Sequence, residues 1–325
     1  MSDRKPLLWF DCGTTNTRLY LIDSETEFSF CGSKAIGSRN VAITGTSLVL
    51  AQAMADLYKE AVTEFALEQD DVDRVYASGL VTSAFGLKEV PHLEAPVSPQ
   101  KLHNAMDKVW VEQMAREIYL IPGVKTTASD WRYTGNVRGE ETEVLGAAVM
   151  LEERGSSSDG VYILPGSHTQ IMYLKNGEIV DILSLFTGEL FHALRSETIL
   201  SHTLNDTPED IIPEFVHQGC SDAMEFGMNR ALYLCHSNQI FQRFTPAQCY
   251  SYAEGVILSG VYTALEQRIQ QHWMDCNRIV LVCDEINRNI YGALLQGSGL
   301  PDIVWLQPSQ RGCFGVRGLS SIVRK

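Results

Sequence analysis

The chain has 325 residues, of which 45% are hydrophobic, and its 26 basic and 40 acidic residues give a formal charge of -14 at pH 7. This length exceeds that of one compact core, so we expect two lobes with a cleft between them. The negative charge argues against binding of nucleic acid over an open surface. A bound phosphate would therefore be met locally, by backbone amides, hydroxyls or a metal ion.

Location and redox state are indicated by what the sequence lacks. The segment Met1–Pro6 leads into an apolar run without the h-region and cleavage site of a secretory signal. No apolar span is long enough to cross a membrane. The eight cysteines are scattered and form no C-x-x-C pair. We therefore expect a cytoplasmic protein without a membrane partner, whose cysteines are reduced and mostly buried.

The first predicted element is a β-hairpin. The apolar run Leu7–Phe10 ends in Asp11, and alternating polar and apolar residues resume after the turn, up to Asp23. A carboxylate at this place can hold a hydrated Mg²⁺, and a glycine lets backbone N–H groups approach phosphate oxygens. The same residues could equally serve only the turn. The candidate phosphate and metal ligands are Asp11, Gly13, Thr14, Thr15, Asn16 and Arg18.

The next elements predict an α/β lobe. Apolar residues at helical spacing predict a long helix over Ser47–Gln69. The segments Arg74–Leu80 and Glu117–Gly123 are each typical of a buried strand that enters a glycine turn, so we expect parallel strands. The polar, turn-prone segment Lys125–Val137 is where we expect the two lobes to join.

A second lobe is expected to begin with another hairpin, Val161–Leu174, which is followed by the tight-turn pair Asn176-Gly177. The glycines of Gly312–Gly318 are expected to form a loop before a closing helix. The remaining predicted helices are Thr187–Leu200, Cys220–Leu234, Ala247–Trp273 and Asn287–Gln296, and the remaining strands are Arg278–Cys283 and Ile303–Leu306.

Acidic residues at the start of a predicted helix form a candidate acid–base site. Gly139 is followed by Glu140 and Glu141, and then by an apolar helical segment. Acids in a first helical turn often only complement the helix dipole. Here a carboxylate could also accept the proton of a hydroxyl that attacks phosphorus, and Arg138 could bind a substrate carboxylate. The sequence contains no P-loop, Rossmann, metalloprotease or nucleophile-elbow motif.

Together these segments resemble the 2-dehydro-3-deoxygalactonokinases, which are sugar-acid kinases of the actin and hexokinase superfamily. The resemblance follows family order and spacing over most of the chain. The segments that carry it are Asp11–Arg18, Ile121–Gly123, Arg138–Thr142, Pro165–Thr169, Phe186–Phe191 and Ser196–Leu200.

The resemblance implies two RNase H-like lobes, residues 1–136 and 137–325, with ATP and Mg²⁺ in the interlobe cleft. The Asp11–Asn16 turn is similar to the first phosphate segment of the superfamily, with Asp11 as the metal ligand. Glu140 is in the place of a general base, and Glu141 is the alternative. The second phosphate segment would be Gly166, Ser167 and His168. The expected acceptor-binding residues are Thr82, Ser83, His92 and Arg138, and Asp284 is expected beside the nucleotide.

Two departures from the family pattern qualify this expectation. Ala84 and Leu87 replace a polar and an aromatic side chain of the expected acceptor pocket, which leaves the acceptor open. Asp284 and Glu285 replace a glycine segment beside the nucleotide and would weaken ATP binding unless they bind ribose or turn outward. We expect a kinase for the 6-hydroxyl of 2-dehydro-3-deoxy-D-galactonate or a close sugar acid, and a possible homodimer. The alternative is a catalytically weak homologue that senses a sugar acid or nucleotide.

Overall fold

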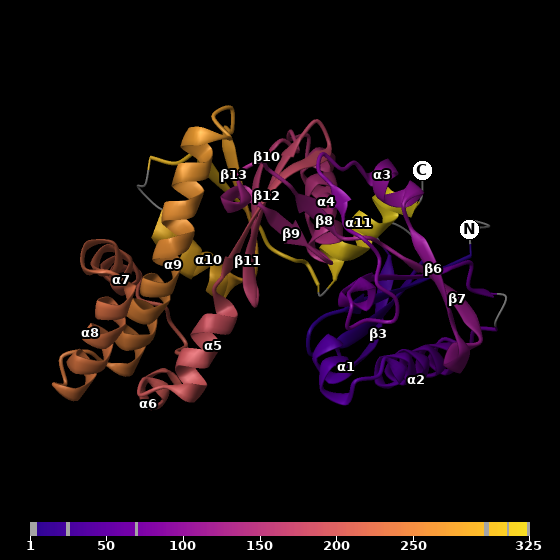
Figure 1. Cartoon of the computed structure of the whole chain (residues 1–325), viewed down its shortest axis with the longest axis horizontal. Helices are drawn as coiled ribbons and strands as arrows, with labels where there is room; N and C mark the ends of the chain where they lie inside the picture. Colours follow the sequence, from indigo (N-terminus) through magenta and orange to yellow (C-terminus); the bar gives the residue numbers. More distant parts are fainter. Residues whose placement is uncertain (1–4, 24–26, 69–70, 296–298, 311, 324–325) are drawn as a thin grey trace. The chain divides into compact units, whose positions relative to one another are not determined.

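The computed structural model describes residues 5–23, 27–68, 71–295, 299–310 and 312–323. Helices and strands are mixed throughout, so the predicted α/β class is confirmed (Figure 1). The chain divides into two compact units. The first comprises Met1–Asp159, Met172–Ile182 and Pro308–Lys325, and the second comprises Gly160–Ile171 and Leu183–Gln307.

A six-stranded sheet forms the centre of the first unit, with the order β3-β2-β1-β4-β7-β6. Strands β1 and β2 pair antiparallel, whereas β1–β4 and β4–β7 are parallel, so the predicted hairpin and parallel strands are confirmed. The strands are β1 (Leu7–Cys12), β2 (Thr17–Ile22), β3 (Phe28–Lys34), β4 (Val75–Gly79), β6 (Asp107–Val111) and β7 (Arg116–Leu120).

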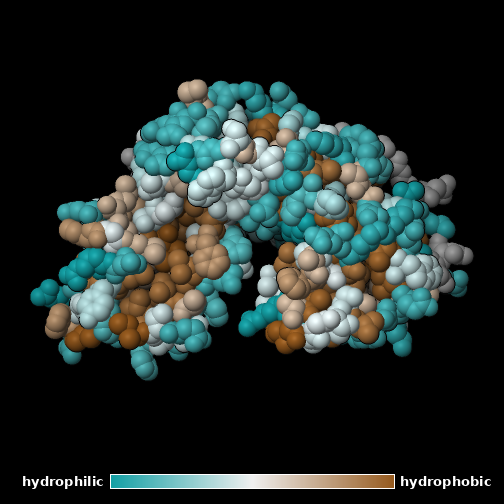
Figure 2. All heavy atoms as spheres, viewed as in Figure 1, coloured by the Kyte–Doolittle hydropathy of each residue, from teal (hydrophilic) through white to brown (hydrophobic). Residues whose placement is uncertain are grey.

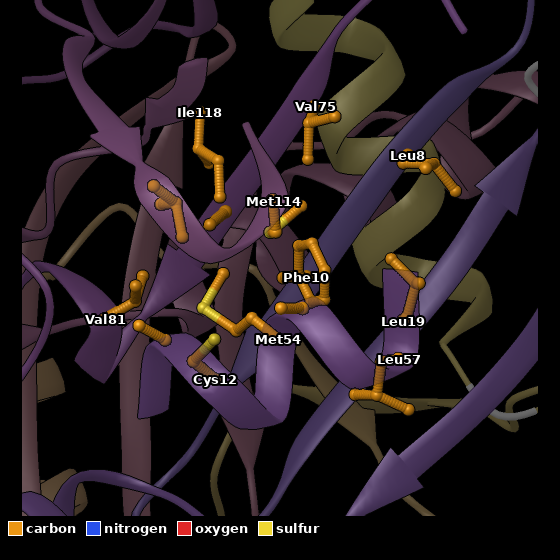
Figure 3. Close-up of a cluster of buried hydrophobic side chains, with 14 of the residues drawn as sticks. Leu8, Phe10, Cys12, Leu19, Met54, Leu57, Val75, Val81, Met114 and Ile118 are labelled. Atoms are coloured by element: carbon orange, nitrogen blue, oxygen red, sulfur yellow. The ribbon is translucent and has the colours of Figure 1, made fainter. Parts of the chain in front are cut away.

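Side chains of β1 alternate between two buried faces of this sheet. Leu8 and Phe10 pack in a core cluster with Met54 and Leu57 of helix α2 (Leu48–Glu64) (Figure 3). Trp9 points to the opposite face and stacks on Tyr20 of β2, with ring centroids 5.2 Å apart. Asp11, two residues further along β1, therefore lies on the Trp9 face of the sheet. The predicted long helix is confirmed, but it covers Leu48–Glu64, so its expected end is too late: Phe65–Glu68 are not helical and Gln69 lies outside the described residues.

Two helices that are distant in sequence, α4 (Glu140–Glu153) and α11 (Cys313–Val323), pack together on glycines. A Cβ atom at Gly318 would lie 1.7 Å from the Thr142 carbonyl oxygen, and one at Gly146 would lie 1.8 Å from that of Phe314. At Gly315 a Cβ would lie 2.2 Å from the Trp9 ring. The expectation of a loop over Gly312–Gly318 is therefore wrong, because most of these glycines belong to the face by which α11 contacts α4 and β1.

The segment expected to join the lobes contributes to a small sheet of the order β5-β8-β9. Helix α4 follows this sheet, and the contact between α4 and α11 places both helices in the first unit. The compact units thus group the residues differently from a boundary at 136/137, while the division into RNase H-like lobes stays a prediction. Further elements of this unit are α1 (Ser38–Thr44), α3 (Pro99–Asn104), β5 (Leu93–Glu94), β8 (Val124–Thr126) and β9 (Gly135–Val137).

A five-stranded sheet of the order β12-β11-β10-β13-β14 repeats the strand arrangement of the first five strands of the other sheet. In this sheet too, the strands beyond the hairpin pair in parallel, β10 with β13 and β13 with β14. At the Asn176-Gly177 turn both residues have positive φ, as a two-residue hairpin requires. The strands are β10 (Gly160–Leu164), β11 (His168–Lys175), β12 (Glu178–Phe186), β13 (Arg278–Val282) and β14 (Asp302–Leu306).

Helices of the second unit mostly follow the prediction, but the helix expected over Cys220–Leu234 is two helices. Gly227, with φ 85°, ends α7 and begins α8. Apolar atoms are visible over the helical part of this unit (Figure 2), and exposed apolar side chains of α7 and α8 include Phe226 and Ile240. The helices are α5 (Gly188–Glu197), α6 (Ser201–Leu204), α7 (Pro213–Phe226), α8 (Met228–Ile240), α9 (Pro246–Gln271) and α10 (Glu285–Leu295).

Gln296, the last residue of the helix expected near α10, lies outside the described residues. All eight cysteines are free, and all but the half-buried Cys276 are buried, as the sequence predicts. None of the helices in the described ranges has the length and apolarity that a membrane crossing requires.

Candidate functional site

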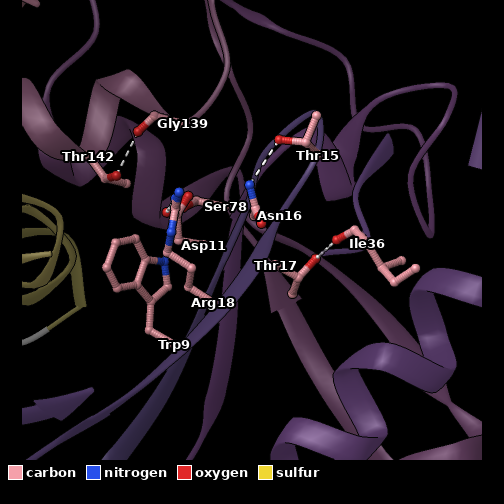
Figure 4. A network of polar contacts seen from close by, with 10 residues as sticks. All are labelled: Trp9, Asp11, Thr15, Asn16, Thr17, Arg18, Ile36, Ser78, Gly139 and Thr142. Atoms are coloured by element: carbon pink, nitrogen blue, oxygen red, sulfur yellow. Dashed lines mark hydrogen bonds and ion pairs between the residues drawn. The ribbon is translucent and has the colours of Figure 1, made fainter. Parts of the chain in front are cut away.

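Asp11 and Arg18 face each other across the first hairpin. They are paired residues of β1 and β2, and Arg18 Nη1 donates to Asp11 Oδ2 at 2.8 Å (Figure 4). Each side chain is 27% exposed. Beside them, Trp9 Nε1 donates to Ser78 Oγ of β4 at 3.0 Å, which fixes the neighbouring strand. The structure thus brings together two predicted site residues, and the guanidinium engages one oxygen of the carboxylate.

The turn after β1 is held by its own backbone. The Gly13 N–H donates to the Asn16 carbonyl oxygen at 2.8 Å, and Asn16 Nδ2 donates to Thr15 Oγ1 at 2.9 Å. Thr14 and Thr15 are exposed. The predicted phosphate segment is therefore a preformed turn with two accessible threonines at its tip.

The start of α1 supports this turn, which the sequence reasoning missed. The Ser38 N–H donates to the Gly13 carbonyl oxygen at 3.2 Å, and the Arg39 N–H donates to that of Thr14 at 3.0 Å. A Cβ atom at Gly37 would lie 2.5 Å from the backbone of both turn residues. The pair Gly37-Ser38 could have indicated the start of a short helix. The sequence did not indicate that this helix start contacts the turn after β1.

Helix α4 begins where β1 and β4 end. Gly139, with φ 119°, precedes the helix, and a Cβ there would lie 3.2 Å from the Cα atom of Gly79, the last residue of β4. Gly79 has φ 85°, and its own Cβ would lie 2.4 Å from the Cys12 carbonyl oxygen. Three segments therefore meet backbone to backbone, and only glycine permits these approaches. The close approach places the first turn of α4 beside the end of β1.

The two candidate bases, Glu140 and Glu141, have different surroundings. Glu141 is fully buried, its Oε2 accepts the Gly139 N–H at 2.7 Å, and its Oε1 has no hydrogen-bond partner among the described residues. Burial, with repulsion from Glu140, raises the pKa of Glu141 to about 8. Glu140 is half-buried, and its Oε2 accepts the Arg138 N–H at 3.2 Å. Of the two carboxylates, Glu140 is the one that a substrate hydroxyl could reach.

A third acid of α4, Glu143, also belongs to this region and was missed from the sequence. Desolvation by surrounding atoms raises the pKa of Glu143 to about 8, and the charges of Asp11 and Glu140 add to the rise. Because the side chain of Glu143 is exposed, water offsets part of the desolvation, while the repulsion from Asp11 and Glu140 remains. The signal in the sequence was the spacing of three residues from Glu140, which puts both acids on one helix face.

Three of the four predicted acceptor residues, Thr82, His92 and Arg138, are joined by hydrogen bonds of the Arg138 side chain. Thr82 and His92 lie at the two ends of the loop Thr82–His92, and Arg138 precedes α4. Thr82 is fully buried, and its hydroxyl donates to the Gly79 carbonyl oxygen at 3.0 Å. Arg138 Nη1 donates to the Thr82 carbonyl oxygen at 2.6 Å, and Arg138 Nη2 donates to His92 Nδ1 at 3.0 Å. Burial, together with the nearby charges of Arg138 and Lys125, lowers the pKa of His92 to about 4. The neutral ring can therefore accept the hydrogen bond.

Ser83, the fourth predicted acceptor residue, stabilises its own turn. Its hydroxyl donates to the Leu80 carbonyl oxygen at 2.7 Å and accepts the Phe85 N–H at 3.2 Å. The side chains of Thr82, Ser83 and His92 are thus hydrogen-bonded to other groups of the protein.

In the second unit, the turn Gly166–His168 contacts the start of α5. The Glu189 N–H donates to the Ser167 carbonyl oxygen at 2.8 Å, and a Cβ at Gly188 would lie 2.3 Å from that of Gly166. His168 is exposed, and its Nε2 lies 3.1 Å from Glu189 Oε2. This turn is therefore supported by a helix start, as the first turn is.

Asp284 begins α10. Its Oδ1 accepts the Asn287 backbone N–H at 2.9 Å and the Asn287 side-chain amide at 3.0 Å. An acid three residues before the N–H that it accepts is a helix N-cap. The cap accounts for Asp284, and a role beside the nucleotide stays a prediction.

The donor set fits a hydrated Mg²⁺ better than an ion in a cage of side chains. In the parts of the chain that the structure describes, no three His, Cys, Asp or Glu side chains gather as a metal site. Magnesium usually keeps several waters and binds one or two carboxylates together with substrate phosphates. Asp11 can supply such a carboxylate, and a cation would offset the repulsion between Asp11 and Glu143.

Comparison with known proteins shows one consistent similarity. A family model described as 2-keto-3-deoxy-galactonokinase matches residues 11–314. A probable 2-dehydro-3-deoxygalactonokinase of Rhizobium meliloti is 28% identical over 194 residues, which cover 60% of this chain and 58% of the relative. The 2-dehydro-3-deoxygalactonokinase of Escherichia coli is 26% identical over 223 residues, which cover 68% of this chain and 64% of the relative. Both matches thus span less than two thirds of the relatives' own lengths.

The fold is also that of a solved structure. A candidate 2-dehydro-3-deoxygalactonokinase protein from Sinorhizobium meliloti superimposes with a TM-score of 0.75 at 20% sequence identity. The superposition covers 98% of both chains. At this identity the likeness establishes the shared fold over nearly the whole length.

Proposed function

Because this chain belongs to the 2-keto-3-deoxy-galactonokinase family, we propose that it is an ATP-dependent sugar-acid kinase. The reaction transfers the γ-phosphoryl group of ATP to the 6-hydroxyl of 2-dehydro-3-deoxy-D-galactonate or a close 2-keto-3-deoxy sugar acid. The observation that carries the proposal is the meeting of the Asp11 turn with the first turn of α4 at Gly79 and Gly139. A phosphate turn and a carboxylate base are the two parts that a hydroxyl kinase needs side by side.

In the proposed reaction Glu140 is the general base. Its carboxylate accepts the proton of the 6-hydroxyl while that oxygen forms a bond to the γ-phosphorus, and the bond from phosphorus to the ADP oxygen breaks. The accessibility of Glu140 and the complete burial of Glu141 support this choice. Glu141 instead holds the Gly139 N–H, which positions the start of the helix.

The phosphates and the metal would be held by the predicted residues. The turn Gly13–Asn16 offers exposed threonines to phosphate oxygens, and we expect the turn Gly166–His168 to contribute donors as well. Asp11 would hold Mg²⁺, which, when bound with ATP, offsets charge on the phosphate oxygens. Arg18 keeps the Asp11 carboxylate oriented through their ion pair.

The comparisons do not favour the alternative of a sensor. It rested on the segment Cys283–Glu285, in which Asp284 caps α10, and the matched family and relatives are named as kinases. We therefore propose only the kinase. The cytoplasmic location and the possible homodimer stay predictions.

The test is ATP turnover with a panel of sugar acids, comparing the wild type with Glu140→Gln. Loss of a general base lowers kcat by about 100-fold or more, and we expect the KM for the acid to change little. Asp302→Asn, an exposed acid in β14, is the matched control and keeps wild-type rates. Undiminished turnover in Glu140→Gln would remove Glu140 as the base, and absence of turnover with every sugar acid would contradict the proposed function.

A further inference from the structure

Arg138 makes more contacts inside the protein than any other predicted acceptor residue. Nη1 donates to the Thr82 carbonyl oxygen at 2.6 Å, to Thr82 Oγ1, and to the Val90 carbonyl oxygen at 3.1 Å. Nη2 donates to the same Val90 oxygen at 3.1 Å and to His92 Nδ1 at 3.0 Å. Both ends of the loop Thr82–His92 are therefore bound by one guanidinium group.

These contacts leave the two terminal nitrogens little capacity for a ligand. Nη1 and Nη2 together carry four hydrogens, and the four acceptor atoms in the loop can use all of them. A substrate carboxylate could bind these nitrogens only by displacing Thr82, Val90 or His92. Displacement would break hydrogen bonds at a fully buried residue, Thr82, which would keep only the Val90 N–H on its carbonyl oxygen and the Gly79 carbonyl oxygen on its hydroxyl.

The backbone of the same residue contacts the proposed base. The Arg138 N–H donates to Glu140 Oε2 at 3.2 Å, and the next residue, Gly139, passes close to Gly79. The residue that binds the loop through its side chain thus also orients the Glu140 carboxylate through its main chain.

We propose that Arg138 is a positioning residue that fixes the loop Thr82–His92 to the start of α4, and that it does not bind the substrate carboxylate. This inference rests on the proposed function, because the loop and Glu140 must approach the same acceptor. The planar fork of arginine places Nη1 on Thr82 and Val90 and Nη2 on His92, and the single ammonium group of lysine cannot occupy both positions.

The first experiment separates positioning from direct binding. It measures kcat and KM for Arg138→Gln and Arg138→Lys with a 2-keto-3-deoxy sugar acid and with the same compound as its uncharged carboxamide. Misplacement of the loop and base lowers kcat/KM by about 100-fold for both acceptors, with losses that agree within about 2-fold. Arg138→Lys is expected to lose activity by the same factor for the two acceptors. A loss that is about 10-fold or more larger for the acid, and that lysine partly restores, would overturn the proposal.

The second experiment needs no substrate. Amide hydrogen exchange is measured at Leu87 and Val90, whose N–H groups donate to the carbonyl oxygens of Val81 and Thr82 at 2.9 and 3.0 Å. We expect Arg138→Gln to accelerate exchange at both amides about 10-fold or more, because the loop loses its attachment. Unchanged exchange in this variant would overturn the proposal.

Arg116→Gln is the matched control for both experiments. Arg116 is also a half-buried arginine of the first unit, and its terminal nitrogens donate to Tyr58 Oη at 3.0 Å and to the Val72 carbonyl oxygen at 3.2 Å. We expect this variant to leave exchange at Leu87 and Val90 unchanged. If the wild type phosphorylates no sugar acid while Arg138→Gln still accelerates loop exchange, the proposed function fails and the attachment of the loop stands.

Discussion

The adjacent carboxylates Glu140 and Glu141 at the start of α4 differ in their exposure to solvent. Glu140 stays accessible, whereas Glu141 is buried with an unpartnered oxygen. Since the folded protein raises the pKa of Glu141 from 4.5 to about 8, the folded state retains a proton that the unfolded chain releases. The resulting stabilisation is complete below pH 4.5 and is lost as the pH rises toward 8.

We predict that Glu141→Gln flattens this pH dependence. The neutral amide has no proton to release, so between pH 5 and 8 the free energy of unfolding should rise relative to the wild type by up to about 1.4 kcal/mol per pH unit. Urea unfolding at pH 5, 6.5 and 8 measures the difference. Parallel pH profiles for the two proteins would show that Glu141 is ionised in the folded state.

At the scale of elements, the site depends on the contact between α4 and α11. Gly146 and Gly318 let the two backbones approach, and Gly315 leaves room for the Trp9 ring, so that the C-terminal helix holds the base-bearing helix against β1. Any side chain in place of Gly146 or Gly318 would collide with backbone atoms of the other helix. The backbone would have to move, and it adjusts less easily than a flexible side chain.

We predict that Gly318→Ala destabilises the protein by about 1–3 kcal/mol through overpacking. The matched control is Gly292→Ala in α10, where a Cβ would meet no atom within 4 Å. There the alanine should stabilise the protein by about 0.5–1 kcal/mol, because alanine favours the helix. Chemical denaturation of both variants measures the two effects, and equal signs would contradict the packing argument.

Local patterns in the sequence predicted the elements better than their contacts. The hairpin β1–β2 and helix α2 could be predicted because their apolar periodicity is continuous. The packing of Gly318 against α4 could not be predicted, because its contact Gly146 is more than a hundred and fifty residues away in the sequence. A break at Gly227 was missed because apolar spacing continues on both sides of it.

Site residues show the same limit. Asp11 and Arg18 could be paired from the hairpin alone, because register places them opposite each other. Gly37 could not be assigned, because its contact with the turn is made by backbone atoms of another segment. For Arg138 the residue type suggested a carboxylate ligand, whereas the structure shows that the hydrogens of Nη1 and Nη2 face acceptors in the loop Thr82–His92.

At the scale of the whole molecule, the charge of -14 opposes the approach of a nucleotide, so binding must depend on local donors and Mg²⁺. We predict that Mg-ATP at about 100 times its Kd stabilises the protein by about 2.7 kcal/mol against unfolding. ATP without Mg²⁺ should stabilise it less, and Asp11→Asn should reduce the difference between the two. Urea unfolding with each ligand measures this, and equal stabilisation with and without Mg²⁺ in the wild type would contradict the role of Asp11.

The central claim is that the chain transfers phosphate from ATP to a sugar acid. The most direct measurement is the amount of ADP, free phosphate and phosphorylated acid formed from Mg-ATP with and without 2-dehydro-3-deoxy-D-galactonate. We predict that ADP forms only with the acid, in equal amount to a product phosphorylated on its 6-oxygen. Formation of ADP and free phosphate at a rate independent of the acid, or no ADP with any 2-keto-3-deoxy sugar acid, would contradict this account.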